Sequence, residues 1–225
     1  MCPLKAKQTG PILCYVTDRL SLRPSSAKQG VQSLVEKIEE TVSAGVDWVQ
    51  LREKDLTAAG WTLLARSALD GGARTAKSRI LLNDRLDVAV SVRAGGLHLS
   101  ENGFPLSKVR EFVKSSVTDA GFLIGVSCHS MEAAQIAARD GADYIHFGPI
   151  FETPSKAGFG QPQGLERLEK VCQAIPIPVI AIGGITLSNA DSCRKAGARG
   201  IAAIRLFQDA QDIEKLVGHL RNLLS

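Results

Sequence analysis

The sequence is poor in aromatic residues and has no long apolar run. Aromatic side chains make up 5% of the 225 residues, so a core must come mainly from Val, Ile, Leu and Ala, which favours a layered α/β fold over an aromatic-cornered sandwich. No stretch approaches the roughly 20 apolar residues that a membrane span needs. The apolar run at residues 12–16 is too short for a signal peptide. We therefore expect a soluble cytoplasmic protein with no membrane partner.

Cysteine and charge are also limited. The five cysteines are an odd number without CxxC spacing, so neither a disulfide framework nor a zinc cage is indicated, and reduced thiols are expected. The net charge of +4 is modest and spread along the chain, and no Lys/Arg run is interleaved with aromatics, which argues against nucleic acid as a partner. Such a charge suits an anionic small molecule such as a phosphate ester.

One pattern recurs along the chain: a helix-like segment, a turn of small residues and a short apolar strand. It covers residues 43–51, 93–99, 139–147 and 195–204. The turns contain Gly45, Gly95, Gly141 and Gly197, each where a helix needs a residue that tolerates the left-handed conformation in order to stop.

Further apolar runs lie between these units and complete a regular alternation. Most runs are continuously apolar, as expected for parallel strands that are buried on both faces. Together they give about eight strands, which matches the small end of the (β/α)8 range. We therefore predict an α/β fold, a single (β/α)8 TIM barrel over residues 1–225, with residues 1–10 as a flexible N-terminal segment. A doubly wound open sheet is the alternative, but no GxGxxG follows the first strand. The expected helices lie near residues 30–44, 57–76, 86–93, 105–114, 131–140, 164–174, 188–196 and 210–224.

The barrel prediction selects candidate site residues, because barrel enzymes carry their catalytic groups at the C-terminal ends of the strands. These positions are rich in polar and basic side chains. In strand order they are Gln50, Arg52 and Lys54; Asn83 and Asp84; His98 and Glu101; Ser127, Cys128 and His129; Thr153, Ser155 and Lys156; Gly183 and Gly184; and Ile204 and Arg205.

Glycine-rich backbone after the seventh strand is a common way for barrels to hold a phosphate, here with a helix that Ser188 would cap. Arg52, Lys54, Lys156 and Arg205 bring more positive charge than one phosphate needs, which predicts two anionic groups. Asp84 is the acidic candidate for a Mg²⁺ ion shared with a pyrophosphate, because Mg²⁺ takes oxygen ligands.

Each of these readings has a structural alternative. The paired glycines could form an ordinary turn, and Lys54 could be a solvated surface lysine. Asp84 could cap the following helix. His98 could be a hydrogen-bonded residue inside the barrel, and we assign His146 and His219 to structure. Cys128 beside His129 suggests a nucleophile, but Cys128 should point away from its neighbour Ser127 along a strand, so we predict a structural role.

Five ordered segments, "QLREKDL", "LNDRLDVAV", "GVSCHS", "GADYIHFGPIFETPSK" and "IPVIAIGGIT", resemble the family of thiamine phosphate synthase and its sister thiazole tautomerase. The resemblance extends from about Tyr15 to Phe207. It implies a (β/α)8 barrel that joins hydroxymethylpyrimidine pyrophosphate to thiazole phosphate with release of pyrophosphate, and that uses Mg²⁺.

The resemblance also assigns roles by position. It places Gln50, Arg52, Lys54, Asn83 and Asp84 around the pyrimidine pyrophosphate and its Mg²⁺, with Ser127 and Lys156 on the pyrophosphate side. It places Thr153, Ser155, Gly184 and Ile204 around the thiazole phosphate.

Two departures from the family pattern keep alternatives open. Gly103 stands where the family has a second acidic Mg²⁺ ligand, for which the nearby Glu101 could substitute. Arg205 stands where the family usually has a serine that contacts the phosphate, so that it could bind the phosphate better or block the pocket. The tautomerase needs no metal and uses a histidine at the position of His129. Retention of Lys54 and Asp84 favours the synthase, since the tautomerase has no pyrophosphate to hold. A non-catalytic binder of thiazole or thiamine phosphates stays open as a further alternative. Pairing into a homodimer stays open.

Overall fold

The computed structural model describes residues 10–22, 30–73, 78–117, 121–153 and 161–225. The flexible segment expected at residues 1–10 lies outside this part of the chain, except for Gly10. None of the helices in the described ranges is both long and apolar enough to cross a membrane.

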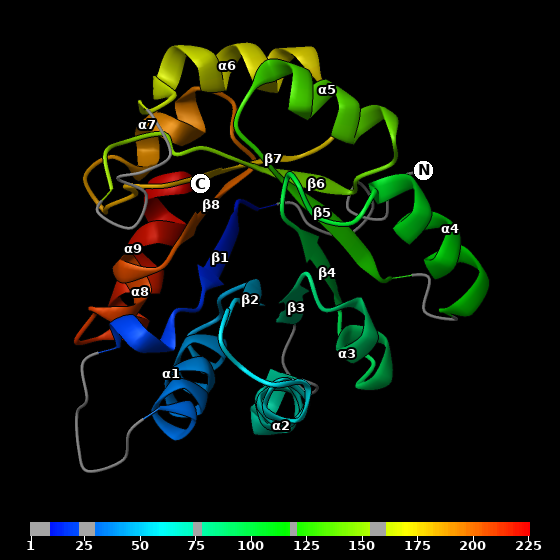
Figure 1. The fold of residues 1–225 in the computed structure, drawn as a ribbon. Coiled ribbons are helices and arrows are strands. Elements are labelled where there is room, and N and C mark those ends of the chain that lie inside the picture. Colours follow the sequence, from blue (N-terminus) through cyan, green and yellow to red (C-terminus); the bar gives the residue numbers. More distant parts are fainter. Residues whose placement is uncertain (1–9, 23–29, 74–77, 118–120, 154–160) are drawn as a thin grey trace.

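Eight parallel strands close into a barrel, in the order of the sequence (Figure 1). The closure is made by the first and last strands, where Ile12 pairs with Gly200 and Tyr15 pairs with Ala203. The predicted (β/α)8 barrel is therefore confirmed, and the open sheet is wrong. The strands are β1 (Ile12–Val16), β2 (Trp48–Leu51), β3 (Arg79–Asn83), β4 (Gly96–Leu99), β5 (Leu123–Cys128), β6 (Tyr144–Phe147), β7 (Val179–Ile182) and β8 (Gly200–Ala203).

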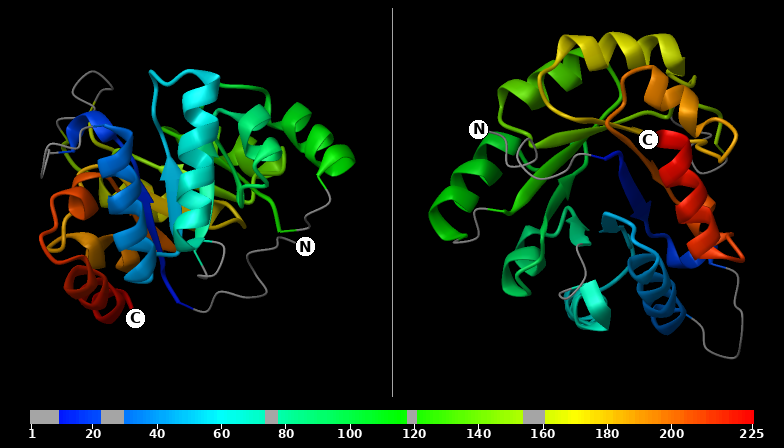
Figure 2. Two further views of the ribbon diagram at one scale, coloured as in Figure 1. Left: turned by 90° about the horizontal axis from the view of Figure 1, so that it is seen from below. Right: turned by 180° about the vertical axis from the view of Figure 1, so that it is seen from behind.

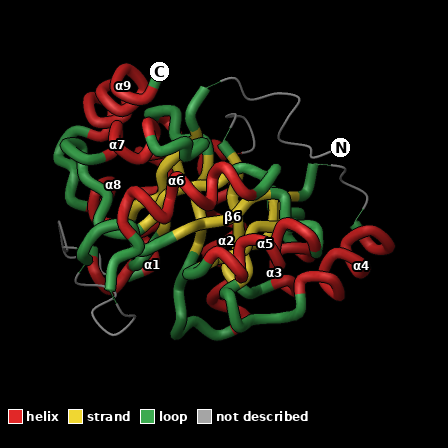
Figure 3. Tube along the Cα trace, turned by 90° about the horizontal axis from the view of Figure 1, so that it is seen from above, coloured by secondary structure: helices red, strands yellow, loops and turns green. Residues whose placement is uncertain are grey.

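Helices surround the barrel, so that the strands form the centre in the tube view (Figure 3). The last helix, α9, contacts α1 and α7 beside the closure (Figure 2). The α-helices are α1 (Val31–Ser43), α2 (Ala58–Ala68), α3 (Leu86–Ser91), α4 (Leu106–Ser116), α5 (Met131–Arg139), α6 (Gly164–Ala174), α7 (Ala190–Lys195), α8 (Arg205–Gln208) and α9 (Ile213–Leu224). A 3-10 turn, η2 (Arg19–Ser21), follows β1, and a π-helical turn, η3 (Leu69–Ala73), follows α2.

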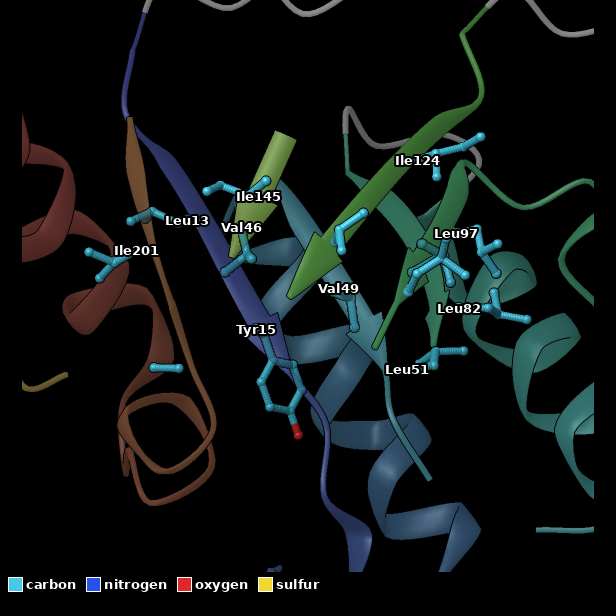
Figure 4. Packing of buried hydrophobic residues seen from close by; sticks show 14 of the residues in the cluster. Leu13, Tyr15, Val46, Val49, Leu51, Leu82, Leu97, Ile124, Ile145 and Ile201 are labelled. Carbon is cyan, nitrogen blue, oxygen red and sulfur yellow. The ribbon is translucent and has the colours of Figure 1, made fainter. Parts of the chain in front are cut away.

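Alternation along the strands divides the buried side chains into two layers. The larger layer lies between the strands and the helices, and Figure 4 shows part of it, including Leu13, Tyr15 and Ile201. The smaller layer fills the barrel interior and contains two large aromatic side chains, Trp48 and Tyr144, with ring centroids 4.6 Å apart. The barrel is thus a packed core, and its strand ends are the surface on which a site can be built.

Three of the four turn glycines adopt the backbone conformation that the sequence predicted. Gly45, Gly141 and Gly197 have φ values of +91°, +97° and +93° after their helices. The prediction is wrong for Gly95, because the left-handed residue after α3 is Arg93, with φ of +55°. Gly95 is instead a place of close approach, where a Cβ atom would lie 3.2 Å from the Cβ of Arg79.

Candidate active site

Polar side chains at the ends of β2, β3 and β4 form one hydrogen-bonded chain. The amide of Gln50 donates to Oδ1 of Asn83 at 2.7 Å, and the Asn83 amide donates to Oδ2 of Asp84 at 2.8 Å. Gln50 is 2% exposed, and its Oε1 has no hydrogen-bond partner in the described part of the chain. A buried acceptor without a partner is costly, so this oxygen is available for a donor on a ligand.

Asp84 is held in an unusual conformation. Its φ is +55°, its N–H donates to the carbonyl of His98 at 2.9 Å, and its Oδ1 accepts the N–H of Ser100 at 2.8 Å. The Ser100 hydroxyl donates to Oδ2 of the same carboxylate. A non-glycine residue at positive φ persists only where its surroundings fix it, and such residues are common at functional sites. The helix-capping alternative is wrong, because the N-cap of α3 is Arg85.

A pocket of about 290 Å³ opens beside this chain, and basic side chains line it. Arg52 is half-buried and Lys54 is exposed, and neither forms an ion pair with any residue that the structure describes. Their charges are therefore available to an anion. The lining residues are Arg52, Glu53, Lys54, Leu56, Trp61, Asn83, Asp84 and Arg85.

Glu53 is a buried acid that the sequence reasoning did not single out. It is 3% exposed and accepts the Thr17 hydroxyl at 2.6 Å and the backbone N–H of Arg19 at 3.1 Å. Burial raises the pKa of its carboxyl. Because Thr17 also accepts the N–H of Arg52 at 2.9 Å, this network fixes the backbone that carries Arg52.

A second pocket, of about 260 Å³, lies across the strand ends at β6, β7 and β8. Gly183 and Gly184 have φ values of +95° and +67°, and a Cβ at Gly184 would lie 2.5 Å from the carbonyl oxygen of Glu152. Gly183 and Gly184 form the floor of this pocket, and only glycine fits these two positions without strain. The lining residues are Asp18, Ser21, Glu152, Thr153, Ile182, Gly183, Gly184, Ile185, Thr186, Ala203, Ile204 and Arg205.

The structure brings Thr153, Gly183, Gly184, Ile204 and Arg205 into one pocket. Thr153, Gly184 and Ile204 are among the residues that the resemblance places around the thiazole phosphate. Ser155 and Lys156 lie outside the described residues.

The helix start predicted beside the glycines differs in detail. Asn189 is the N-cap of α7, and the Ser188 hydroxyl bonds to that of Thr186 at 2.9 Å instead of capping the helix. Asn189 accepts the N–H of Thr186 at 2.8 Å and donates to the carbonyl of Gly184 at 2.9 Å. Asn189 thereby ties the glycine turn to α7.

The residues around Cys128 divide between two environments. Cys128 is 1% exposed in the outer layer, and burial, followed by the charge of Glu101, raises its pKa to about 12. A thiol with that pKa is a poor nucleophile, so the structural reading of Cys128 fits its surroundings. Ser127 points the other way, and its Oγ lies 2.9 Å from Nε2 of His98.

His129 forms a contact that the sequence did not predict. Its Nδ1 is paired with Oε2 of Glu101, the residue considered as a substitute metal ligand. Across the described ranges, no group of three or more His, Cys, Asp or Glu side chains is arranged to hold a metal ion. His98 and His146 face the barrel interior with ring centroids 4.3 Å apart, and His219 lies in α9.

Comparison with known proteins gives a consistent picture. The family model described as thiamine monophosphate synthase matches residues 23–207. A Geobacter sulfurreducens protein is 43% identical over 192 residues, which cover 85% of this chain and 84% of that protein. The thiamine-phosphate synthase of Roseiflexus castenholzii is 36% identical over 203 residues, covering 90% and 83% of the two chains. A solved thiamine phosphate pyrophosphorylase from Pyrococcus furiosus is 30% identical, with a TM-score of 0.79 and 95% of each chain covered.

Proposed function

The chain belongs to the thiamine monophosphate synthase family, and from this premise we propose how its two strand-end pockets carry out the reaction. The protein is a transferase, a thiamine-phosphate synthase. In that reaction hydroxymethylpyrimidine pyrophosphate and thiazole phosphate give thiamine phosphate and pyrophosphate. We assign the pyrimidine pyrophosphate to the pocket of Arg52 and Lys54, and the thiazole phosphate to the glycine-floored pocket.

The observation that carries this assignment is that the pocket of Arg52 and Lys54 and the glycine-floored pocket both lie at strand ends and have no lining residue in common. Each pocket has at least one basic side chain: Arg52, Lys54 and Arg85 in the first, and Arg205 in the second. Two anionic substrates that must react with each other need two such sites opening on one space. A protein that bound a single phosphate would need only one.

The chain's own groups account for binding and charge neutralisation. Arg52 and Lys54 stabilise the negative charge that grows on the pyrophosphate as it leaves. The unpartnered Oε1 of Gln50 accepts a hydrogen bond from the pyrimidine's amino group. Glycine at 183 and 184 lets the backbone approach the thiazole phosphate, with Thr153 and Arg205 at its side. We propose that Lys156 contributes to binding the pyrophosphate and Ser155 to binding the thiazole phosphate.

The oxygen ligands at the basic pocket show whether the site suits Mg²⁺. Asp84 offers a carboxylate at the edge of the basic pocket, and Mg²⁺ in such sites takes one or two carboxylates and otherwise water and phosphate oxygens. The residues therefore fit an ion held by Asp84 and the pyrophosphate. When bound, the ion would neutralise charge on the leaving group. Glu101 is paired with His129, so it could join as a ligand only after leaving that partner.

The same pair favours a second candidate activity. A carboxylate that is paired with Nδ1 of an imidazole orients the ring and raises its basicity. His129 could thereby act as the base of a thiazole tautomerase, the sister activity.

The deciding experiment supplies the purified protein with pyrimidine pyrophosphate, thiazole phosphate and Mg²⁺. We expect thiamine phosphate and pyrophosphate in equal amounts. If no product forms at any Mg²⁺ concentration while the thiazole phosphate carboxylate is isomerised, and His129→Ala abolishes that isomerisation, the protein is the tautomerase. If both ligands bind and neither reaction occurs, the protein is a binder.

A further inference from the structure

A hydrogen-bonded chain runs from the mouth of the barrel into its core. Oγ of Ser127, at the end of β5, lies 2.9 Å from Nε2 of His98 on β4. Nδ1 of the same ring lies 3.0 Å from the hydroxyl of Tyr144 on β6. His98 and Tyr144 are fully buried, whereas Ser127 is half-buried and thus the only member that reaches solvent.

Tyr144 fixes the direction of this chain. Among the described residues its hydroxyl makes one hydrogen bond, to His98, and burial raises its pKa well above the usual value, so it keeps its proton. A buried O–H must find an acceptor, and the acceptor within reach is Nδ1 of His98. A neutral imidazole carries its proton on one nitrogen only, so Nε2 bears the hydrogen and donates it to Ser127.

The direction matters because a serine hydroxyl has one hydrogen. If Oγ of Ser127 accepts from His98, its own O–H is directed to another acceptor, and Ser127 is partly exposed next to the C-terminal end of β5. The reverse polarity would turn the O–H toward His98 and present only lone pairs to a ligand. Lone pairs repel an anion, whereas an O–H donor stabilises it.

From this geometry we propose that His98 and Tyr144 are positioning residues, which set the hydroxyl of Ser127 as a hydrogen-bond donor to the pyrophosphate group. The inference rests on the proposed function, since it requires the pyrophosphate held by Arg52 and Lys54 to extend to Ser127, which the sequence resemblance places on the pyrophosphate side. It assigns a role in the reaction to two buried residues that touch no substrate.

Packing holds the hydrogen-bonded rings of His98 and Tyr144 in place. Position 125 on β5 is glycine, and a Cβ there would overlap the ring of Tyr144. The Tyr144 ring packs at a tilt of 50° against Trp48, with centroids 4.6 Å apart, and its centroid lies 5.4 Å from that of His146. The centroids of the His98 and His146 rings are 4.3 Å apart. Because neighbouring rings contact the Tyr144 ring on several sides, we expect the ring to keep its position in Tyr144→Phe, which removes only the hydroxyl.

The test is a double-mutant cycle on inorganic pyrophosphate binding, measured by calorimetry without turnover. We expect Tyr144→Phe and Ser127→Ala each to weaken binding by about 3- to 10-fold, the effect of one hydrogen bond. The double variant should bind as weakly as Ser127→Ala alone, because Tyr144 acts through Ser127. His98→Gln, which can accept from Tyr144 and donate to Ser127, should retain binding, and His98→Leu should not.

The other tyrosine of the protein provides a matched control. Tyr15 is its other tyrosine, and its buried hydroxyl has no hydrogen-bond partner among the described residues. It lies in the outer layer (Figure 4), so Tyr15→Phe should leave pyrophosphate binding unchanged. Thiazole phosphate binding should be unchanged in both Tyr variants, which separates a positioning effect from general damage to the barrel.

A second readout addresses the ring itself. Nitrogen-15 NMR of the four histidines should show one ring, missing in His98→Gln, with hydrogen on Nε2, and Tyr144→Phe should shift that ring's signals. Hydrogen on Nδ1 in the native protein, or additive losses in the cycle, would overturn the inference. A native protein that binds pyrophosphate with this coupling but forms no thiamine phosphate would overturn the proposed function only.

Discussion

The carboxylate of Glu101 is paired with the imidazole of His129, and this contact joins the segment after β4 to the residue after β5. Both side chains are 29% exposed. The pair engages the acid that could replace the missing second aspartate, while Asp84 is held separately by Asn83 and Ser100. We therefore expect Asp84, and not Glu101, to be the carboxylate that binds Mg²⁺.

The first prediction follows from that separation. Asp84→Asn should lower turnover by about 10²-fold and raise the Mg²⁺ concentration needed for half-maximal rate, because it removes the anionic ligand. Glu101→Gln should change turnover by less than about threefold, as expected for an exposed pair. Rates measured across a Mg²⁺ titration check both. Equal losses in the two variants would show that Glu101 leaves His129 and binds the ion.

Lys54 is predicted to stabilise the leaving group. Lys54→Ala should lower kcat by roughly 10²- to 10³-fold, the usual cost of removing one donor aimed at developing charge. Lys170→Ala is the matched control, because Lys170 is an exposed lysine paired with Glu166 on α6. Steady-state kinetics of both variants decide, and unchanged kcat in Lys54→Ala would place the pyrophosphate elsewhere.

The glycine floor of the second pocket should tolerate no side chain. In Gly184→Ala the new Cβ meets the Glu152 carbonyl at 2.5 Å, and φ is +67°, so we expect a loss of about 1–3 kcal/mol in unfolding free energy and weaker thiazole phosphate binding. Gly218→Ala, in α9 with nothing within 4 Å of its Cβ, should gain about 0.5–1 kcal/mol. Urea unfolding compares the two, and a neutral Gly184→Ala would contradict the proposed floor.

Cys128 should be inert in the folded protein. With a pKa of about 12, its thiolate fraction at pH 8 is on the order of 10⁻⁴, so iodoacetamide should not modify it before unfolding. Mass spectrometry of the digested protein locates the label. Cys128→Ala should retain most of the activity. A loss comparable to that of Lys54→Ala would instead support Cys128 as a nucleophile.

The sequence was sufficient to predict the barrel and most of the strand-end residues, because both depend on local patterns. Continuous apolar runs mark parallel strands, and the residue after each run lies at the mouth. Asp84 follows from that rule, and Gln50 and Asn83 lie within the last two residues of β2 and β3. The hydrogen bonds that join these three side chains were not part of the prediction.

Contacts that depend on register or side-chain direction could not be predicted. The bond between His98 and Tyr144 spans two strands that do not pair with each other, since β5 lies between them. The bond exists because position 125 on β5 has no side chain. The pairing of Glu101 with His129 depends on where a loop turns, and the placement of Arg93 rather than Gly95 at positive φ depends on how α3 ends.

The space that Gly125 leaves for the ring of Tyr144 has a consequence for how this sequence can change over evolution. The two positions share one volume, so a larger residue at 125 is acceptable only in a lineage that has already reduced residue 144. The intermediate in either order is penalised, by overlap in one case and by a cavity in the other. The pair should therefore be inherited together, and a barrel that loses one member must first pass through a less stable ancestor.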